Sequence, residues 1–489
     1  METRKITTIE PGKWRQFFAT ILINLSSLSY GMILGWSSPM APLLQSPGTP
    51  IGTAPMTNDQ MSWMNGILCI GALAVLPICS SLAERFGRKI TGCIIAVPSG
   101  LCWLLILFAR DWTYLLAARL FAGFAAAVLI FVIPIYVSEI SGDSVRGQYG
   151  SILVFSVNIG ILLAYIFGAI LPYNIFALCA LVIPMLFLGG FVFMPETPIY
   201  LMRRGRVAEA TRSLMWLKAN DKASVDHELT RLQALAKENS ANDKSVGFRA
   251  LFRDRGTFKG FMIAMAMLGG QQFCGISAVV AYTATIFKLA GSSLAPNTAT
   301  ILVGSIQVAG SWLSTVMMER AGRRPLIMIS CAGMAVCHCV LGSFLLVQSS
   351  GHDVHSFSWI PVTAISGYAI VYCLGMGPAP FVVASEVFSS DISGFANSIS
   401  MVFMWIVSFI MMKFFPFIMD TLTIGGSFFL LAGFCVCSLV FTFFFVPETK
   451  GRNIESILDE LNGFSESFRE ARYQRTSVEM IGKNTHQAV

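Results

Sequence analysis

Long runs of apolar residues, separated by short polar intervals, dominate the chain. Each run comes close to the roughly 20 residues that an α-helix needs to cross a bilayer. The runs predict about twelve such helices, at residues 17–37, 62–82, 91–109, 114–138, 149–169, 174–193, 259–280, 298–318, 325–347, 359–384, 395–418 and 426–446. The pattern therefore indicates an all-α protein that crosses a membrane many times.

A single long polar interval divides the predicted spans into two groups of six. Inside it, Val207, Ala210 and Leu214 recur at the spacing of one helix face, which predicts short amphipathic helices. Another such helix is predicted after the last span, with Gly463 as its stop. We therefore divide the chain into an N-terminal tail (1–16), a first half (17–197), an intracellular helical segment (198–258), a second half (259–447) and a C-terminal tail (448–489).

The two halves carry the same charged motifs in the same order. The turn Glu-Arg-x-Gly-Arg follows the second span and returns after the eighth, and a glutamate ends both the fourth and the tenth span. Pro-Glu-Thr follows the sixth span and again the twelfth. This order describes a duplicated six-helix unit whose parallel halves are related by an axis along the membrane normal. A substrate site is then expected between the halves, near the middle of the membrane.

The charged groups of these motifs all emerge on one side of the membrane. Because a guanidinium pairs with a carboxylate in a bidentate way, we expect them to form an inner-gate latch that joins the two halves and breaks when substrate leaves. The alternative is that the turns only anchor helix ends. The predicted latch residues are Glu84, Arg85, Arg88, Glu139, Arg146, Glu196, Glu319, Arg320, Arg323, Glu386 and Glu448.

Composition and charge agree with a membrane protein. Of 489 residues, 55% are hydrophobic and 12% are charged, whereas a soluble domain carries about 25% charged residues. The formal charge is +7, and all lysines and arginines except Arg110, Arg119, Lys288 and Lys413 fall on the side of the two tails. Since Lys and Arg resist translocation, both termini are expected in the cytoplasm. The charge is thus explained by topology and gives no reason to expect a nucleic-acid partner.

Sequence signatures of other chemistry are missing. There is no P-loop, no Gly-x-Ser-x-Gly elbow and no carboxylate pair inside a span, so an enzyme is not expected. All 12 cysteines lie within predicted spans, where a cysteine is usually a small buried apolar residue. No Cys/His spacing suggests a metal site, and no cofactor is expected.

Several motifs, taken together, resemble one known family. They are Pro134-Ile-Tyr-Val-Ser-Glu139 with Arg146-Gly147, Pro195-Glu196-Thr197-Pro198, Gln271-Gln272-x-Cys274-Gly275-Ile276, Gly377-Pro378-Ala379-Pro380 and Pro447-Glu448-Thr449-Lys450-Gly451. From about residue 17 to residue 462, the chain resembles the sugar porter family of the major facilitator superfamily, and within it the insect facilitated glucose and trehalose transporters. The resemblance implies alternating access around a central sugar site, a plasma-membrane location and a carrier that functions as a monomer in the lipid bilayer.

The resemblance also implies which residues bind the sugar. Gln271 and Gln272 match a pair that hydrogen-bonds sugar hydroxyls, and an amide suits this role because it both donates and accepts. The alternative is that they tie helices together, as amides often do in membranes. The remaining predicted contacts are Asn158, Ser277, Tyr282, Gln307, Phe381, Trp405 and Ser408.

Several of these positions depart from the family pattern. Ser277 and Ser408 stand where the family has asparagines, and Phe381 replaces a tryptophan that follows the tenth-span prolines. Asn158 lies one turn after the position of a glutamine that is absent here. The set of sugar-binding amides is therefore reduced, which bears on affinity and substrate choice but not on the fold.

The tenth span has a predicted hinge at Gly377, Pro378 and Pro380, because each proline removes a backbone hydrogen bond. A static kink is the alternative. On the inner side, Ser393 replaces the arginine that usually completes the tenth-span motif, so a weaker latch is expected in the second half.

Proton coupling is not expected. Proton-coupled members of the family carry an aspartate in the first span, and residues 17–37 contain no carboxylate. His338 is titratable, but a lone histidine in a span is more often a packed contact. A facilitative uniporter for a hexose or a trehalose-like disaccharide is the favoured hypothesis. The alternatives are a proton-coupled symporter, a non-transporting sugar sensor, or a porter with a changed substrate.

Overall fold

The computed structural model describes residues 12–463, apart from 53, 143, 242–250, 253 and 453. For residues 235–241, 319, 390 and 391 it describes the backbone alone. All regular structure in this part of the chain is helical, and 11 helical segments in it are long and apolar enough to cross a membrane. The expected all-α membrane fold is confirmed.

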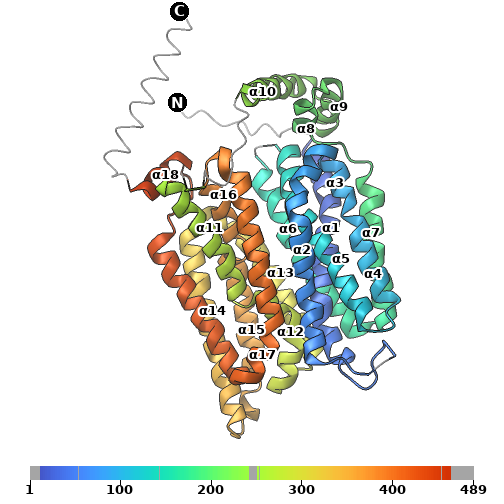
Figure 1. Ribbon diagram of the computed structural model, residues 1–489, viewed down its shortest axis with the longest axis vertical. Helices are drawn as coiled ribbons and strands as arrows, with labels where there is room; N and C mark the ends of the chain where they lie inside the picture. Colours follow the sequence, from blue (N-terminus) through green and yellow to red (C-terminus); the bar gives the residue numbers. More distant parts are fainter. Residues whose placement is uncertain are drawn as a thin grey trace, which may run out of the picture.

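The first half contains six spans, which lie together on one side of the molecule (Figure 1). Its helices are α1 (Lys13–Leu44), α2 (Asn58–Phe86), α3 (Arg88–Ile94), α4 (Ala96–Leu107), α5 (Trp112–Ile140), α6 (Arg146–Ile170) and α7 (Tyr173–Phe191), of which α3 and α4 make one span.

The second half forms a parallel bundle beside the first (Figure 1). Its helices are α11 (Arg255–Phe273), α12 (Ile276–Ala290), α13 (Pro296–Ala321), α14 (Arg323–Ser349), η2 (His355–Phe357), α15 (Ile360–Val371), η3 (Tyr372–Met376), α16 (Ala379–Glu386) and α17 (Ser390–Phe445). The long helix α17 is two spans, because the backbone of Thr423 breaks it with φ 63° and ψ 163°. With α17 divided there, the described residues contain the twelve spans that the apolar runs predict.

Four shorter helices gather at one end of the bundle. They are α8 (Pro198–Arg203), α9 (Val207–Leu217), α10 (Lys222–Ala241) and α18 (Ile454–Asn462), as the helical spacing predicts, and Gly463 follows α18 with φ 86° (Figure 1). We call this end of the molecule the linker end and the opposite end the far end. The expected tails 1–16 and 448–489 lie largely outside the described residues.

Glycines let the helices of the first half pack closely. A Cβ on Gly31 of α1 would lie 2.0 Å from the Val157 carbonyl oxygen of α6, and one on Gly123 of α5 would lie 2.0 Å from the Leu68 carbonyl oxygen of α2. Small residues at such crossings let backbones approach where lipid supplies no hydrophobic force between helices. The pairs α1–α6 and α2–α5 are therefore held by direct backbone contact.

Three helix pairs bring the two halves together: α1 with α12, α2 with α17, and α6 with α13. In the first pair, the Ala284 amide donates to Ser38 Oγ at 3.0 Å. Tyr165 of α6 donates through its hydroxyl to the Val280 carbonyl of α12 at 3.1 Å. Since α12 lies toward the far end (Figure 1), these contacts close that end of the interface between the halves.

Candidate functional site

Two helices of the second half are interrupted near mid-depth, and both interruptions face polar side chains. Between α11 and α12, Gly275 takes φ 88°, a left-handed conformation that favours glycine. The carbonyl of Cys274 lies at this break. It accepts from the Tyr368 hydroxyl at 3.1 Å, and His338 Nε2 lies 3.1 Å from it. The predicted seventh span lies within residues Arg255–Ala290, but the break inside it was not predicted, because a lone glycine in an apolar run gives no clear signal of one.

The tenth span is interrupted where the prolines predict. The π-helix η3 separates α15 from α16, and Pro378 and Pro380 lie at the junction. A proline lacks the N–H that would bond the carbonyl four residues earlier, which frees the carbonyls of Leu374 and Met376. Ser314 Oγ donates to the Leu374 carbonyl at 3.5 Å. The broken helix is therefore satisfied by side chains of its neighbours.

Gln271 supplies the main support for this junction. Its Nε2 donates to the carbonyls of Met376 at 2.9 Å and Gly377 at 2.7 Å. Its Oε1 accepts from Gln272 Nε2 at 3.4 Å. The side chain is almost fully buried. In this conformation Gln271 ties α11 to the tenth span, which is the alternative role that the sequence left open.

A polar line leads from Gln272 to the first half. Ser277 donates to Gln272 Oε1 at 2.7 Å, and the Ser277 and Ser408 hydroxyl oxygens lie 3.4 Å apart. Cys69 of α2 then donates to Ser408 Oγ at 3.5 Å. Three predicted sugar contacts are thus neighbours, and they lie at the interface between the halves.

A second polar group crosses the interface between α6 and α13. Gln307 Nε2 donates to Asn158 Oδ1 at 2.9 Å, and Asn158 Nδ2 donates to Ser311 Oγ. All three residues are buried. The structure therefore pairs the predicted contacts Asn158 and Gln307 with each other.

The aromatic candidates occupy different environments. The indole of Trp405 lies three residues before Ser408 on α17, and its Nε1 is buried with no hydrogen-bond partner in the described part of the chain. Phe381 is half-buried and packs against the apolar core. The ring of Tyr282 stacks on Phe415 with centroids 6.0 Å apart, and its hydroxyl accepts from Asn65 Nδ2 at 3.2 Å.

A buried cation lies in the first half, which the sequence did not predict. Arg119 lies in the second turn of α5, and its side chain is inside the bundle and almost fully buried. It donates to the Ile33 carbonyl at 2.6 Å and to Ser37 Oγ, and its guanidinium lies 5.1 Å from the Trp36 ring. Ser37 donates in turn to Asn65 Oδ1 at 2.8 Å. The chain Arg119–Ser37–Asn65 thus reaches the Tyr282 hydroxyl, and it contains no carboxylate.

Four of the predicted latch residues form two ion pairs, each within one half. Arg88 pairs with Glu139 at 3.1 Å in the first half, and Arg323 pairs with Glu386 at 3.1 Å in the second. These two pairs do not join the halves in this conformation, so the expected latch between the halves stays a prediction for a carrier that is closed at the linker end. The repeated motif carries its own partner in each copy, so each pair braces the linker end of a single half.

The glutamates of the two Pro-Glu-Thr motifs cap the first turns of α3 and α14. Glu196 Oε1 accepts from the backbone N–H groups of Arg88, Lys89 and Thr197 at 2.9–3.1 Å. Glu448 accepts in the same way from Arg323 and Arg324 at 3.0 and 3.1 Å. Burial raises the pKa of Glu196, and the N–H donors and the Arg88 charge oppose that rise.

Other latch candidates make local contacts. Arg85 lies over the Phe86 ring at 5.5 Å, and the carbonyls of Glu84 and Arg320 accept from Arg204 and Lys450. Arg146 is the first residue of α6. The side chain of Glu319 lies outside the described residues.

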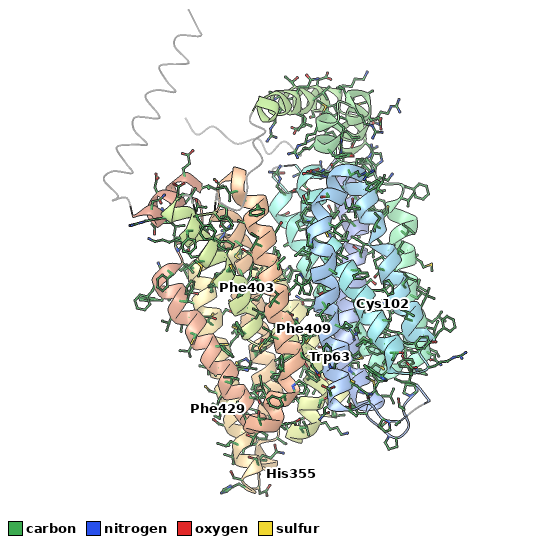
Figure 2. All side chains as sticks on the ribbon, in the orientation of Figure 1. Trp63, Cys102, His355, Phe403, Phe409 and Phe429 are labelled. Atoms are coloured by element: carbon green, nitrogen blue, oxygen red, sulfur yellow. The ribbon has the colours of Figure 1, made fainter. Side chains whose placement is uncertain are left out.

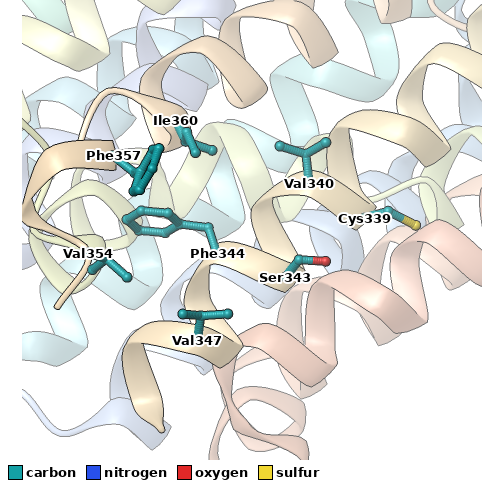
Figure 3. Close-up of a pocket in the computed structure, with 8 residues that line it drawn as sticks. All are labelled: Cys339, Val340, Ser343, Phe344, Val347, Val354, Phe357 and Ile360. Carbon is teal, nitrogen blue, oxygen red and sulfur yellow. The ribbon is translucent and has the colours of Figure 1, made fainter. Parts of the chain in front are cut away.

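A separate apolar pocket of about 500 Å³ lies on the second half, between α14 and the segment that leads into α15 (Figure 3). Ser343 and Cys339 are its only polar side chains among the eight lining residues, the others being Val340, Phe344, Val347, Val354, Phe357 and Ile360. A sugar needs several hydrogen-bonding partners, so this pocket does not suit one.

The chain matches known transporters along nearly its whole length. Residues 19–461 match the family model described as "Sugar (and other) transporter". The chain is 32% identical over 452 residues to the facilitated trehalose transporter Tret1 of Polypedilum vanderplanki, which covers 92% of this chain and 88% of the relative. It is 30% identical over 474 residues to Tret1 of Bombyx mori, which covers 97% of this chain and 92% of that relative.

Solved structures show the same fold at lower identity. The inward-open xylose transporter XylE of E. coli superposes with a TM-score of 0.73 at 21% identity, covering 90% of this chain and 99% of that one. The proton:xylose symporter XylE bound to 6-bromo-6-deoxy-D-glucose gives a TM-score of 0.71 at 21% identity, covering 91% and 99%.

Proposed function

Since the chain belongs to the sugar (and other) transporter family, it is a transporter and not an enzyme, and we propose that it carries trehalose or a hexose by facilitated diffusion. The relatives named above are facilitated trehalose transporters. The sugar binds between the halves, and the two halves open alternately toward the linker end and the far end. We place the carrier in the plasma membrane as a monomer, with the linker end in the cytoplasm.

The observation that carries this proposal is the group of hydrogen-bonding side chains where the halves meet. Gln272, Ser277 and Ser408 form a connected line there, and Trp405 adds a buried donor that no group in the described part of the chain accepts. A buried donor without a partner costs free energy of about 1–3 kcal/mol. A sugar hydroxyl is an acceptor of the right kind to satisfy it.

Facilitated transport is favoured over proton symport by the surroundings of Arg119. This buried guanidinium donates to a carbonyl and a serine hydroxyl, and no Asp or Glu occurs in the middle of any span. Proton relays in membranes are built from titratable side chains at such depth. No carboxylate is available for such a relay, and the titratable side chain of His338 contacts the Cys274 carbonyl at the break in the seventh span.

Uptake measurements test the proposal. Oocytes that express the chain should accumulate labelled trehalose or glucose above control oocytes, with saturable kinetics. The Gln272→Ala variant should show a higher KM at equal surface expression. If surface-expressed protein takes up neither sugar, a sensor or a porter with a changed substrate replaces this proposal.

A further inference from the structure

Along the interface between α2 and α17, side chains form a continuous seam that runs toward the far end. Asp59, Ser62, Gly66 and Cys69 recur every three or four residues, so they lie on one face of α2. The seam ends at mid-depth with the contact between Cys69 and Ser408. We call this set of contacts the α2–α17 seam.

Packing in the middle of the seam is close. A Cβ on Gly66 would lie 3.2 Å from the Phe409 ring and 3.6 Å from Lys413 Cβ, so glycine lets α17 approach α2 here. Next to it, the rings of Trp63 and Phe409 lie 6.3 Å apart across the interface (Figure 2). The two halves are therefore in direct apolar contact over this part of the seam.

Lys413 closes the seam at the far end, and its ammonium contacts three residues of the opposite half. Its Nζ is 2.5 Å from Asp59 Oδ1 and 2.9 Å from Ser62 Oγ, and it lies 4.5 Å from the centroid of the Trp63 ring. The Lys413 side chain is 14% exposed, whereas that of Asp59 is 75% exposed. A single cation of the second half thus contacts an anion, a hydroxyl and an aromatic face of the first.

We propose that Lys413 and Asp59 form a far-end lock, which keeps the carrier closed on that side and must break in each transport cycle. The inference rests on the proposed alternating-access cycle. The ion pair Lys413–Asp59 joins the two halves. Separation of α2 from α17 at this end breaks all contacts of the ammonium together, whereas the pairs Arg88–Glu139 and Arg323–Glu386 stay within their halves.

A simpler role for each residue exists. Asp59 lies in the first turn of α2, where a carboxylate favours the helix dipole, and a lysine near the end of a span can serve as an interfacial anchor. Those roles act equally in every conformation. The lock differs because it acts only when the far end is closed, so its loss shifts the ratio of the two conformations. For a partly exposed pair with a cation–π contact, we expect a shift of about three- to tenfold.

Cys69 provides a readout, because it is buried in the seam and becomes reachable from outside only when the seam opens. Intact oocytes are treated with a charged, membrane-impermeant methanethiosulfonate reagent, and the labelling lost in Cys69→Ser defines the signal from this thiol. Lys413→Met and Asp59→Asn should each raise the Cys69 labelling rate about three- to tenfold. The double variant should raise it no further, since both changes break one pair.

Two further variants keep the result interpretable. Lys288→Met removes an exposed cation of α12 near the same end and should leave the rate unchanged. The charge exchange Lys413→Asp with Asp59→Lys should return the rate toward wild type. Labelling that stays at the wild-type rate in both single variants, or effects that add in the double variant, would overturn the lock.

The readout is independent of the substrate. If neither trehalose nor glucose is transported but Cys69 labelling responds as described, the lock stands and the proposed sugar is wrong. If a sugar is transported normally while labelling does not respond, the proposed function stands and the lock is wrong.

Discussion

Replacing Gln271 by leucine should separate the structural role of this side chain from a role in sugar binding. The substitution keeps the approximate volume but removes the amide that donates to the Met376 and Gly377 carbonyls. The Met376 carbonyl has no helical donor of its own, because residue 380 is a proline without an N–H. Both carbonyls are buried at the junction of the tenth span, where water does not replace the lost donor.

The magnitude follows from these two bonds. An unsatisfied buried carbonyl costs about 1–3 kcal/mol, so the loss of both donors should lower the free energy of unfolding by roughly 2–4 kcal/mol. For a chain of 489 residues, this corresponds to a fall in melting temperature of about 2–4 °C. Gln272→Leu is the matched control. It loses the bond from Ser277 and a long 3.4 Å contact, and should lower the melting temperature by less than about 2 °C.

Thermal unfolding of both purified variants in detergent, with and without trehalose, is the assay. Without sugar, Gln271→Leu should melt well below Gln272→Leu. With sugar, the stabilisation seen in wild type should shrink in Gln272→Leu, because Gln272 belongs to the proposed line of sugar contacts. A Gln271→Leu protein that melts like wild type would refute the argument that this amide supports the broken helix.

Four further substitutions test other parts of the site. Arg88→Gln should destabilise the protein by about 3 kcal/mol, because it leaves the 10% exposed Glu139 carboxylate unpaired. Arg323→Gln should destabilise it less, because the side chains of Arg323 and Glu386 are 18% and 29% exposed. Equal melting temperatures of the two variants would contradict this. Ser393→Arg should slow opening toward the linker end and lower turnover by about two- to fivefold, because it adds an ion pair. Efflux kinetics measure this, and unchanged turnover would count against the reasoning. Trp405→Phe should raise KM about three- to tenfold without changing the melting temperature, because the indole N–H has no hydrogen-bond partner among the described residues. A lowered melting temperature with normal KM would show that the indole only packs.

Hydrophobic runs predicted the spans well, because each span must be apolar over the thickness of the bilayer. The interruption of the tenth span was also predictable, since Pro378 and Pro380 cannot complete the helical hydrogen bonds. The break at Gly275 was not, because glycine is common in membrane helices. The structure shows the left-handed conformation of Gly275, and beside it His338 and Tyr368 contact the Cys274 carbonyl.

Charged residues were placed less well than apolar ones. The sequence located the repeated Arg and Glu motifs but not their partners, because a motif that occurs twice can pair within a copy or between copies. The burial of Arg119 was not predicted, for a different reason. Its partners are a backbone carbonyl and the hydroxyl of Ser37, and neither leaves a recognisable spacing in the sequence.

Sugar flux under an imposed proton gradient tests the central claim most directly. The full-length protein is reconstituted into proteoliposomes, and labelled trehalose and glucose are followed with the interior at higher pH than the exterior. A facilitative carrier should bring at least one of these sugars to the same concentration inside and outside, with or without a protonophore. Accumulation of sugar above the external concentration, abolished by the protonophore, would contradict the account and show that the carrier is coupled to protons.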